Sequence, residues 1–141
     1  MNVYADTSFF ASVYLPDQHT ANALRRLAAK PRIWMTPFHR LELAHAISQK
    51  VYRDEIPQDS ADRVQALLAQ DCELGVWAWT EFPGAAFVRG VELARLHVPK
   101  LGCRSLDTLH VAAAMEFGSQ QFWTFDERQA KLARAVRLKS T

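Results

Sequence analysis

Cysteine is scarce in this sequence. Only two cysteines occur among 141 residues, Cys72 and Cys103, and they form neither a Cys-x-x-Cys pair nor a Cys/His cluster with metal-binding spacing. This pattern excludes a disulfide framework, a zinc knuckle and a thioredoxin-type redox site. We expect both cysteines to be small hydrophobic residues of the core.

Long apolar runs are missing too. The most apolar stretch near the N-terminus lies between Asp6 and Asp17, is ten residues long and has no basic segment before it. A signal peptide needs such a basic segment, and a membrane helix needs about 20 apolar residues. The sequence therefore predicts neither, and it favours a cytoplasmic protein with no membrane partner.

Internal repeats, low-complexity tracts and Gly/Ser-rich linkers are also absent. With 49% hydrophobic and 23% charged residues, the composition is that of an ordinary globular protein. A chain of this length buries roughly 68–70% of the surface that its unfolded form exposes. We therefore expect residues 1–141 to form a single domain with a real core.

Short apolar segments alternate along the chain with helical patterns, and no hairpin signal joins them. The predicted strands are residues 2–5, 33–36, 74–79 and 121–125, with 135–138 as a possible fifth strand at an edge. Strands that alternate with helices imply a parallel sheet covered on both faces. The sequence thus predicts the α/β class, as a three-layer α/β/α sandwich around a parallel sheet of about five strands.

Hydrophobic spacing, capping residues and prolines set the limits of the predicted helices. We expect Leu67 to point into the core, and Phe87 and Val91 to form part of a buried stripe in a helix that Pro99 breaks. Gly118 is a good stop for the helix before the fourth strand. The predicted helices cover residues 9–15, 20–29, 37–53, a stretch after Pro57, 83–98, 105–117 and 126–134.

Two acids follow predicted strands. Asp6 ends the first strand and Asp126 follows the fourth. Ligands of open parallel sheets bind beyond the carboxyl ends of the strands, so both side chains are candidates for a site. Helix capping is the alternative for each acid, and it is strong for Asp126 because Asp126-x-x-Gln129 and Thr124-x-x-Glu127 both match capping boxes.

Two further acids interrupt apolar helix faces, where a carboxylate is rarely placed without a partner. Glu42 lies between Phe38 and Ala46, and Asp107 shares a stripe with Val111. The alternatives are a boundary side chain that reaches solvent for Glu42 and a first-turn acid favoured by the helix dipole for Asp107.

Four carboxylates that converge in a partly buried site would repel one another and take up protons unless a cation neutralised them. Hard oxygen ligands of this kind suit Mg²⁺ or Mn²⁺, which keeps several waters and completes its shell with substrate phosphate. The cofactor that such a site predicts is therefore Mg²⁺ or Mn²⁺.

Four segments that contain these acids resemble, in order and spacing, the motifs of PIN-domain ribonucleases. The resemblance is greatest to the VapC toxins of bacterial toxin–antitoxin pairs, and it runs from Met1 to about Leu138. The four segments are Asp6-Thr7-Ser8, Arg40-Leu41-Glu42-Leu43-x-x-Ala46, Ser105-Leu106-Asp107-Thr108-Leu109-His110-x-Ala112-x-Ala114 and Thr124-Phe125-Asp126.

This resemblance implies a Mg²⁺-dependent endoribonuclease with a five-stranded parallel sheet, a homodimeric state and a cognate antitoxin as partner. It assigns the acidic metal site to four residues, of which none is missing, and adds three supporting hydroxyls. The acids are Asp6, Glu42, Asp107 and Asp126, and the hydroxyls are those of Thr7, Ser8 and Thr124.

A metal in such a site would lower the pKa of a water that attacks the RNA phosphodiester in line. We expect Asp6 and Asp107 to be direct ligands and Glu42 to be a ligand or the group that orients and deprotonates the water. Asp126 is expected to serve a second or water-mediated site.

The net charge of +2 conceals a basic surface. Without the four site acids, 15 − 4 = 11 acids face 17 Lys and Arg residues, an excess of 6 bases. Arg128, Lys131 and Arg134 recur at helical spacing just after Asp126, and no acid follows them. This basic strip is a candidate track for the phosphates of RNA. The alternative is a solvated helix whose basic end complements its dipole.

Other functions fit less well. An aspartyl-phosphate phosphatase needs a second acid two residues after Asp6, where Ser8 stands, and a phospho-receiver module needs a Lys after a late strand, where Phe125 and Asp126 stand. A non-nuclease phosphoryl-transfer or phospho-receiver-like α/β domain with an acidic Mg²⁺ site remains the alternative. His110, one turn beyond Asp107, is expected to be a hydrogen-bonded core histidine.

Overall fold

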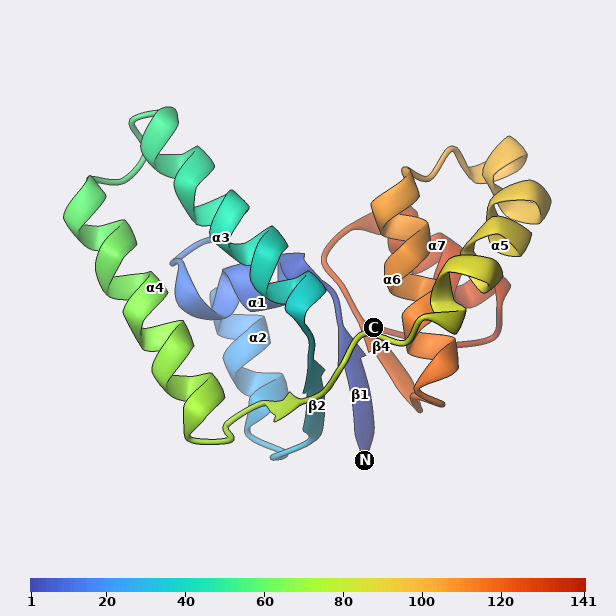
Figure 1. The fold of residues 1–141 in the computed structure, drawn as a ribbon, viewed down its shortest axis with the longest axis horizontal. Helices are drawn as coiled ribbons and strands as arrows, with labels where there is room; N and C mark the ends of the chain where they lie inside the picture. The colour runs from blue at the N-terminus through green and yellow to red at the C-terminus, as the bar shows by residue number, and fades with distance from the viewer.

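The computed structural model describes residues 1–141 and contains a five-stranded parallel sheet in the order β3-β2-β1-β4-β5 (Figure 1). The strands are β1 (Asn2–Ala5), β2 (Arg32–Met35), β3 (Ala78–Trp79), β4 (Gln121–Trp123) and β5 (Lys139–Ser140). The helices are α1 (Thr7–Tyr14), α2 (Thr20–Leu27), α3 (Pro37–Tyr52), α4 (Gln58–Glu73), α5 (Ala85–Leu101), α6 (Ser105–Glu116) and α7 (Glu127–Ala135).

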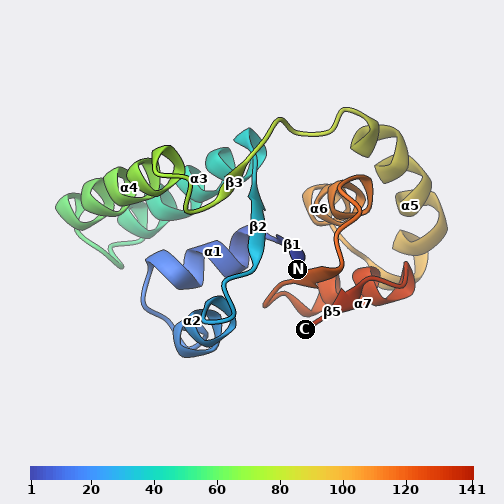
Figure 2. The same ribbon diagram turned by 90° about the horizontal axis from the view of Figure 1, so that it is seen from below.

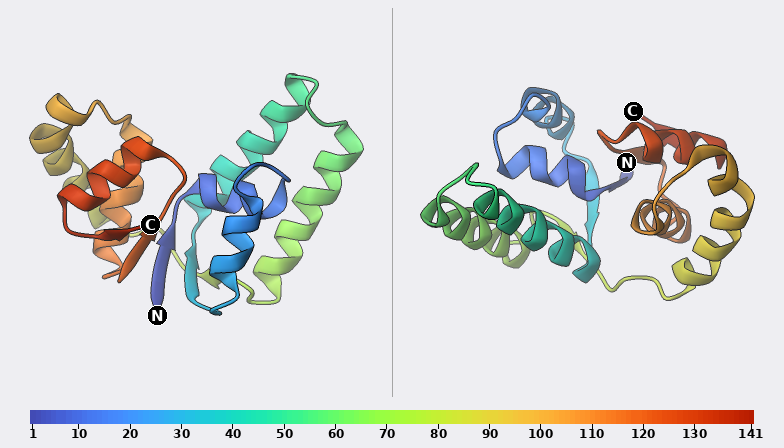
Figure 3. Two further views of the ribbon diagram at one scale, coloured as in Figure 1. Left: turned by 180° about the vertical axis from the view of Figure 1, so that it is seen from behind. Right: turned by 90° about the horizontal axis from the view of Figure 1, so that it is seen from above.

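Helices cover both faces of the sheet. Successive residues of a strand point to opposite faces, and β1 follows this rule: Val3 and Ala5 pack against α1, α2, α3 and α4, whereas Tyr4 packs against α5, α6 and α7. Figure 2 shows the first four helices on one side of the sheet and the last three on the other, and the views in Figure 3 agree. The predicted three-layer sandwich with a parallel sheet is confirmed.

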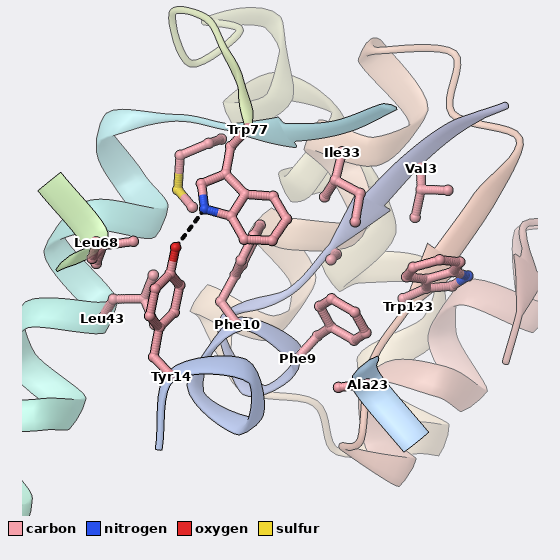
Figure 4. Close-up of a cluster of buried hydrophobic side chains, with 12 residues drawn as sticks. Val3, Phe9, Phe10, Tyr14, Ala23, Ile33, Leu43, Leu68, Trp77 and Trp123 are labelled. Atoms are coloured by element: carbon pink, nitrogen blue, oxygen red, sulfur yellow. Dashed lines mark hydrogen bonds between the residues drawn. The ribbon is translucent and has the colours of Figure 1, made fainter. Parts of the chain in front are cut away.

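The largest of the three buried hydrophobic clusters contains aromatic side chains joined by hydrogen bonds (Figure 4). The indole Nε1 of Trp77 donates to the Tyr14 hydroxyl at 2.7 Å, and that hydroxyl donates to Asp71 Oδ2 at 2.5 Å. Trp77 also meets the ring of Phe10 edge-on, with 5.0 Å between centroids. These contacts tie α4 and the segment after it to α1.

The predicted third strand, residues 74–79, is mostly wrong, because β3 contains only the last two of these residues. The earlier ones end α4 in a Schellman motif. The Val76 amide donates to the Asp71 carbonyl at 2.9 Å and the Gly75 amide to the Cys72 carbonyl at 3.3 Å. Gly75 has the left-handed φ of +72° that this motif requires. As a result Val76 is 55% exposed.

The possible fifth strand at residues 135–138 is wrong for the same reason. The Leu138 amide donates to the Ala133 carbonyl at 2.9 Å and the Arg137 amide to the Arg134 carbonyl at 3.0 Å. Arg137 takes the left-handed conformation, with a φ of +65°. These residues therefore terminate α7, and the fifth strand forms just after them.

Helix α5 does not break at Val98-Pro99 as predicted, but continues through Pro99 to Leu101. Proline removes one backbone donor, and here this happens only in the last turn. The Gly102 amide closes that turn by donating to the Val98 carbonyl at 2.8 Å. None of the helices has the length and apolar character that a membrane span requires.

Some apolar side chains predicted to be buried lie on the surface. Phe87 and Val91 of α5 are each 60% exposed, and Leu67 of α4 is 48% exposed. The residues that α5 contributes to the core are instead Ala86 and Leu93. The prediction failed because helical spacing identifies an apolar face but not the side on which the neighbouring helix packs.

Candidate acidic active site

The site lies at the carboxyl ends of β1 and β4, which are neighbours in the sheet. Ala5 and Trp123 are paired at the ends of these strands, and the Asp6 amide donates to the Trp123 carbonyl at 2.9 Å. Asp126 follows three residues beyond Trp123. The chain therefore brings Asp6 and Asp126 to the same edge of the sheet.

Asp6 is completely buried, and both carboxylate oxygens accept hydrogen bonds. Oδ1 accepts from Ser8 Oγ at 2.6 Å and from the Phe9 amide at 3.1 Å, while Oδ2 accepts from Thr124 Oγ1 at 2.7 Å. Burial raises the pKa of Asp6, and His110 and these donors offset part of that rise. Asp6 thus caps α1 and also faces the site.

Two hydroxyls join Asp6 to the loop that carries Asp126. The Phe125 amide donates to Ser8 Oγ at 3.0 Å, and the Asp126 amide donates to Thr124 Oγ1 at 2.9 Å. Because each hydroxyl also donates to the Asp6 carboxylate, the position of one acid constrains the other.

Glu42 is held on the other side by groups of two different elements. Its Oε1 accepts a hydrogen bond from Thr7 Oγ1 at 2.6 Å and forms an ion pair with His110 Nε2. Burial acts to raise the pKa of Glu42, but His110 and the Thr7 hydroxyl outweigh it, so this pKa lies below its ordinary value. Glu42 does not reach freely into solvent, since its side chain is only 22% exposed.

Tyr4 was not predicted to be part of the site. Its buried hydroxyl lies 2.8 Å from His110 Nδ1, so His110 joins Tyr4 to Glu42. Tyr4 stands between two residues that point to the opposite face of the sheet, and this alternation was the one available signal. His110 is 1% exposed and hydrogen-bonded, as expected for a core histidine.

Asp107 and Asp126 form the third part of the site. Asp107 Oδ2 accepts from the Arg104 amide at 3.3 Å, and Oδ1 accepts from Gln129 Nε2 at 3.2 Å. Burial, followed by the charge of Asp126, raises the pKa of Asp107. Asp126 Oδ1 caps α7 by accepting from the amides of Arg128 and Gln129. The capping alternative therefore describes real contacts of Asp126, and Asp107 lies in the first turn of α6, as its own alternative supposed.

The four carboxylates could bind a hard divalent cation only in a site that waters complete. No group of three or more His, Cys, Asp or Glu side chains is close enough to form a ready metal cage. Mg²⁺, however, is typically held by one or two carboxylates and several waters, and every acid here offers hard oxygens. The buried Oε1 of Gln129, whose Nε2 contacts Asp107, has no hydrogen-bond partner. A coordinated water would satisfy it.

The predicted basic strip lies on the exposed side of α7, where Arg128, Lys131 and Arg134 are all exposed. Arg134 is paired with Glu127 Oε1 at 2.9 Å. The side chains of Arg128 and Lys131 form no ion pair, so they are the members of the strip that remain free to meet phosphates.

The sequence model of the PIN-domain family matches residues 3–135, and the chain belongs to this family. Among solved structures, VapC20 of Mycobacterium tuberculosis, a toxin that cleaves the sarcin-ricin loop, has a similar fold, with a TM-score of 0.69 at 18% identity over 96% of this chain and 95% of that one. No curated protein matches the sequence.

Two further solved structures contain chains of similar fold. VapBC2 of Rickettsia felis, bound to a DNA fragment from its promoter, gives a TM-score of 0.68 at 18% identity over 100% of this chain and 98% of that one. FitAcB of Neisseria gonorrhoeae gives a TM-score of 0.64 at 14% identity over 98% of this chain and 95% of that one. These likenesses extend over nearly the whole chain and agree with the fold described above.

Proposed function

We propose that this protein is a Mg²⁺- or Mn²⁺-dependent endoribonuclease and the toxin of a type II toxin–antitoxin pair. The observation that carries the proposal is the set of four partly or fully buried carboxylates at one sheet edge of a PIN domain. The fold likeness to a toxin that cleaves the sarcin-ricin loop supports RNA as the substrate.

The burial and contacts of each acid suggest its role in the site. Asp6 and Asp107 would be the direct ligands of the cation, since both are carboxylates that burial makes costly to ionise without one. Asp126 would act through water or at a second ion. When bound, the cation would lower the pKa of a water and offset charge on the phosphoryl oxygens.

Glu42 is suited to bind the cation, or to orient the attacking water and accept its proton. Its lowered pKa keeps it ionised at neutral pH, which either role requires. Thr7 and His110 both hold Oε1, so Oε2 is the oxygen left for the water. In-line attack on the phosphodiester then releases one of its two RNA fragments.

The residues around Asp6 disfavour the phosphoryl-transfer alternative. An aspartyl-phosphate phosphatase needs a second acid two residues after the nucleophile, where this chain has Ser8, and the Ser8 hydroxyl donates to Asp6 Oδ1 at 2.6 Å. Trapping of a covalent phosphate on Asp6 would contradict the hydrolytic proposal.

Cleavage of RNA by the purified protein tests the proposal. We expect cleavage in Mg²⁺ or Mn²⁺ and none in EDTA. Asp6→Asn and Asp107→Asn should each lower the rate by about 100-fold or more, the scale of loss when a preorganised electrostatic group is removed. Expression of the wild type alone should arrest growth of the host, and neither variant should do so.

Asp54→Asn is the matched control, because Asp54 is exposed and outside the site. Its φ of +57° is a conformation that Asn adopts readily. This variant should cleave RNA as fast as the wild type. Folded Asp6→Asn and Asp107→Asn proteins that match the wild type would refute the proposal.

An antitoxin is the expected protein partner, and two of the solved relatives in fold are VapBC2 and FitAcB complexes. We propose that a small protein encoded beside this one lays a peptide over the acidic edge and places an Arg or Lys among the carboxylates. A groove of about 470 Å³ between α3 and α6, lined by Phe38, Leu41, Glu42 and Leu106 among others, opens beside the site.

Co-purification with the neighbouring gene product tests this partner. The complex should show little nuclease activity, and release of the partner should restore it. Glu42→Gln in the chain should weaken the complex, because one of the acids that attracts the cationic side chain loses its charge. A bound partner that leaves nuclease activity unchanged would exclude inhibition by occupancy of the site.

Self-association into a homodimer is a further part of the proposal. Large apolar side chains of α5 and α6 are exposed together, among them Phe87, Val91 and Leu106, which border a common groove. Burial of this surface between two copies would stabilise a dimer. Light scattering after size-exclusion chromatography should give twice the 16.0 kDa mass of the chain, and Val91→Glu should give a monomer.

A further inference from the structure

A second pocket adjoins the acidic site, on the side away from Glu42. It has a volume of about 300 Å³ and lies between the start of α1, the turn before α2 and the loop after β4. Its lining includes Ser8 and Asp126 of the acidic site together with Asp17, His19 and Phe125. An RNA that presents a phosphate to the acids therefore brings a neighbouring nucleotide within reach of this pocket.

The wall of the pocket contains a flat aromatic stack. The rings of His19 and Phe125 are nearly parallel, with 4.3 Å between centroids and 6° between planes. The guanidinium of Arg26 lies 5.2 Å from the centroid of Phe125 and supports the stack. Arg26 is itself held by Asn22 Oδ1 at 2.7 Å. Single-stranded RNA is commonly bound by stacking of unpaired bases on aromatic side chains.

The same pocket contains an ionised acceptor. Asp17 Oδ2 accepts from Ser12 Oγ at 2.7 Å, and Oδ1 accepts from the His19 amide at 2.7 Å. Burial acts to raise the pKa of Asp17, but these donors outweigh it and hold the pKa below its ordinary value. A carboxylate has about four acceptor positions, so the exposed Asp17 side chain can accept further bonds from a ligand.

We propose that this pocket binds a guanine base of the RNA beside the cleaved phosphodiester, with the base stacked on His19 and its Watson–Crick edge bonded to Asp17. Guanine presents two adjacent donors on that edge, N1–H and the N2 amino group, which match the two oxygens of a carboxylate. Adenine, cytosine and uracil each present only one donor there. The inference rests on the proposed ribonuclease function and adds a base preference to it.

Binding without cleavage tests the pocket independently of the nuclease activity. Short unstructured RNAs that differ at a single position, guanosine, inosine or adenosine, are titrated against the Asp6→Asn protein in EDTA. Inosine lacks only the N2 amino group, and its RNA should bind about 10-fold more weakly, the scale of a lost bidentate base contact. Equal affinity for the guanosine and inosine RNAs would overturn the proposal.

The Asp17→Asn change, made in the same Asp6→Asn background, should bring the ratio of the two affinities to about 1. His19→Ala should weaken all three RNAs alike, because stacking does not distinguish bases. Asp54→Asn in this background is the matched control and should keep the full ratio. Thermal melts check that each variant folds, and a ratio that survives Asp17→Asn in a folded protein would exclude Asp17 as the reader of the base.

Cleavage mapping separates the two proposals. With wild-type protein and Mg²⁺, cuts in an RNA of mixed sequence should lie next to guanosines, and Asp17→Asn should spread them over other bases. Cleavage without a guanosine preference would refute the guanine-binding pocket and support the ribonuclease function. A protein that binds guanosine RNA preferentially but never cleaves RNA would support the pocket and refute the ribonuclease function.

Discussion

Three of the four candidate acids lie at the beginning of a helix. Asp6 caps α1, Asp107 accepts from the Arg104 amide at the start of α6, and Asp126 caps α7. Capping and metal binding were alternatives when only the sequence was considered, but one carboxylate can serve both. Asn keeps the oxygen that a cap needs and removes the charge that a cation needs. Asp→Asn changes therefore separate the two roles.

His110 offers a sharper test of how Glu42 is positioned. The amide nitrogen of Gln can take the place of His Nε2, whereas that of Asn corresponds to Nδ1. His110→Gln should therefore keep the donor to Glu42, and His110→Asn should lose it. We expect His110→Asn to weaken Mn²⁺ binding by about 10–100-fold, as is typical when the partner of a metal ligand is removed.

Mn²⁺ affinity measured by calorimetry at fixed pH checks this prediction, with melting temperatures of both variants as the control for folding. His110→Gln should lie within a few-fold of the wild type. If the two variants lose affinity equally while both remain folded, the contact between Nε2 and Glu42 does not position the acid.

The opposite pKa shifts of Asp107 and Glu42 predict opposite effects on stability. The pKa of Asp107 is raised, so its ionised form opposes folding at pH 7 and protonation just above pH 3.8 favours it. The pKa of Glu42 is lowered, so its ionised form stabilises the fold above about pH 4.5 and this contribution is lost as the pH falls. In EDTA at pH 7, Asp107→Asn should melt higher than wild type and Glu42→Gln lower.

Each shift should be roughly 2–4 °C, the change that about 1 kcal/mol produces in a chain of this size. Thermal melts of the three proteins in EDTA at pH 7 and pH 5 provide the measurement. The advantage of Asp107→Asn should shrink as the pH is lowered, because the raised pKa of Asp107 makes the wild-type carboxyl take up its proton in the folded state before it does so in the unfolded state. A lower melting temperature for Asp107→Asn at both pH values would contradict the prediction that the ionised Asp107 opposes folding.

Helix ends account for the errors in the predicted elements. Residues 74–79 and 135–138 are apolar enough to resemble strands, but each begins with a Schellman motif. Gly75 is a residue from which such a helix end can be predicted. Arg137 is not, because a basic residue rarely takes a left-handed φ. The strands near residues 2–5, 33–36 and 121–125 were predicted well because buried parallel strands are continuous apolar runs.

The two motifs predict stability changes of opposite sign. Arg137→Gly should raise the free energy of unfolding by about 1 kcal/mol, because it removes a side chain from a left-handed residue. Gly75→Ala should lower it by a similar amount, since a Cβ there meets open space and only the backbone strain counts. Urea unfolding of both variants checks the pair, and equal signs would contradict the explanation.

At the scale of the molecule, alternating strands and helices were sufficient to predict the parallel sheet, its two covered faces and the edge where Asp6 and Asp126 meet. The arrangement around Glu42 was not predictable. It depends on how α3 and α6 approach each other, and His110 and Glu42 are 68 residues apart in the chain. A local sequence pattern cannot predict a contact between residues so far apart in the chain.

Cation binding should be visible as a change in the stability of the whole chain. A ligand that binds only the folded state at about 100 times its dissociation constant adds roughly 2.7 kcal/mol. For this chain we expect a rise of about 5–10 °C in melting temperature with Mg²⁺. Asp107→Asn should respond less. An unchanged melting temperature of the wild type in saturating Mg²⁺ would show that the acids do not share a site for the ion.

The hydrogen bond between Asp6 and Thr124 spans 118 positions of the chain. The strand that leads to Asp6, β1, is made well before β4, one of its two neighbours in the sheet, which leads to Thr124. At about 5–20 residues per second, roughly 6–24 s separate the synthesis of the two partners. The acidic edge therefore does not exist until β4 has been made, so under the proposed function a nascent chain that still lacks β4 has no site with which to cut the messenger or the ribosome that is making it.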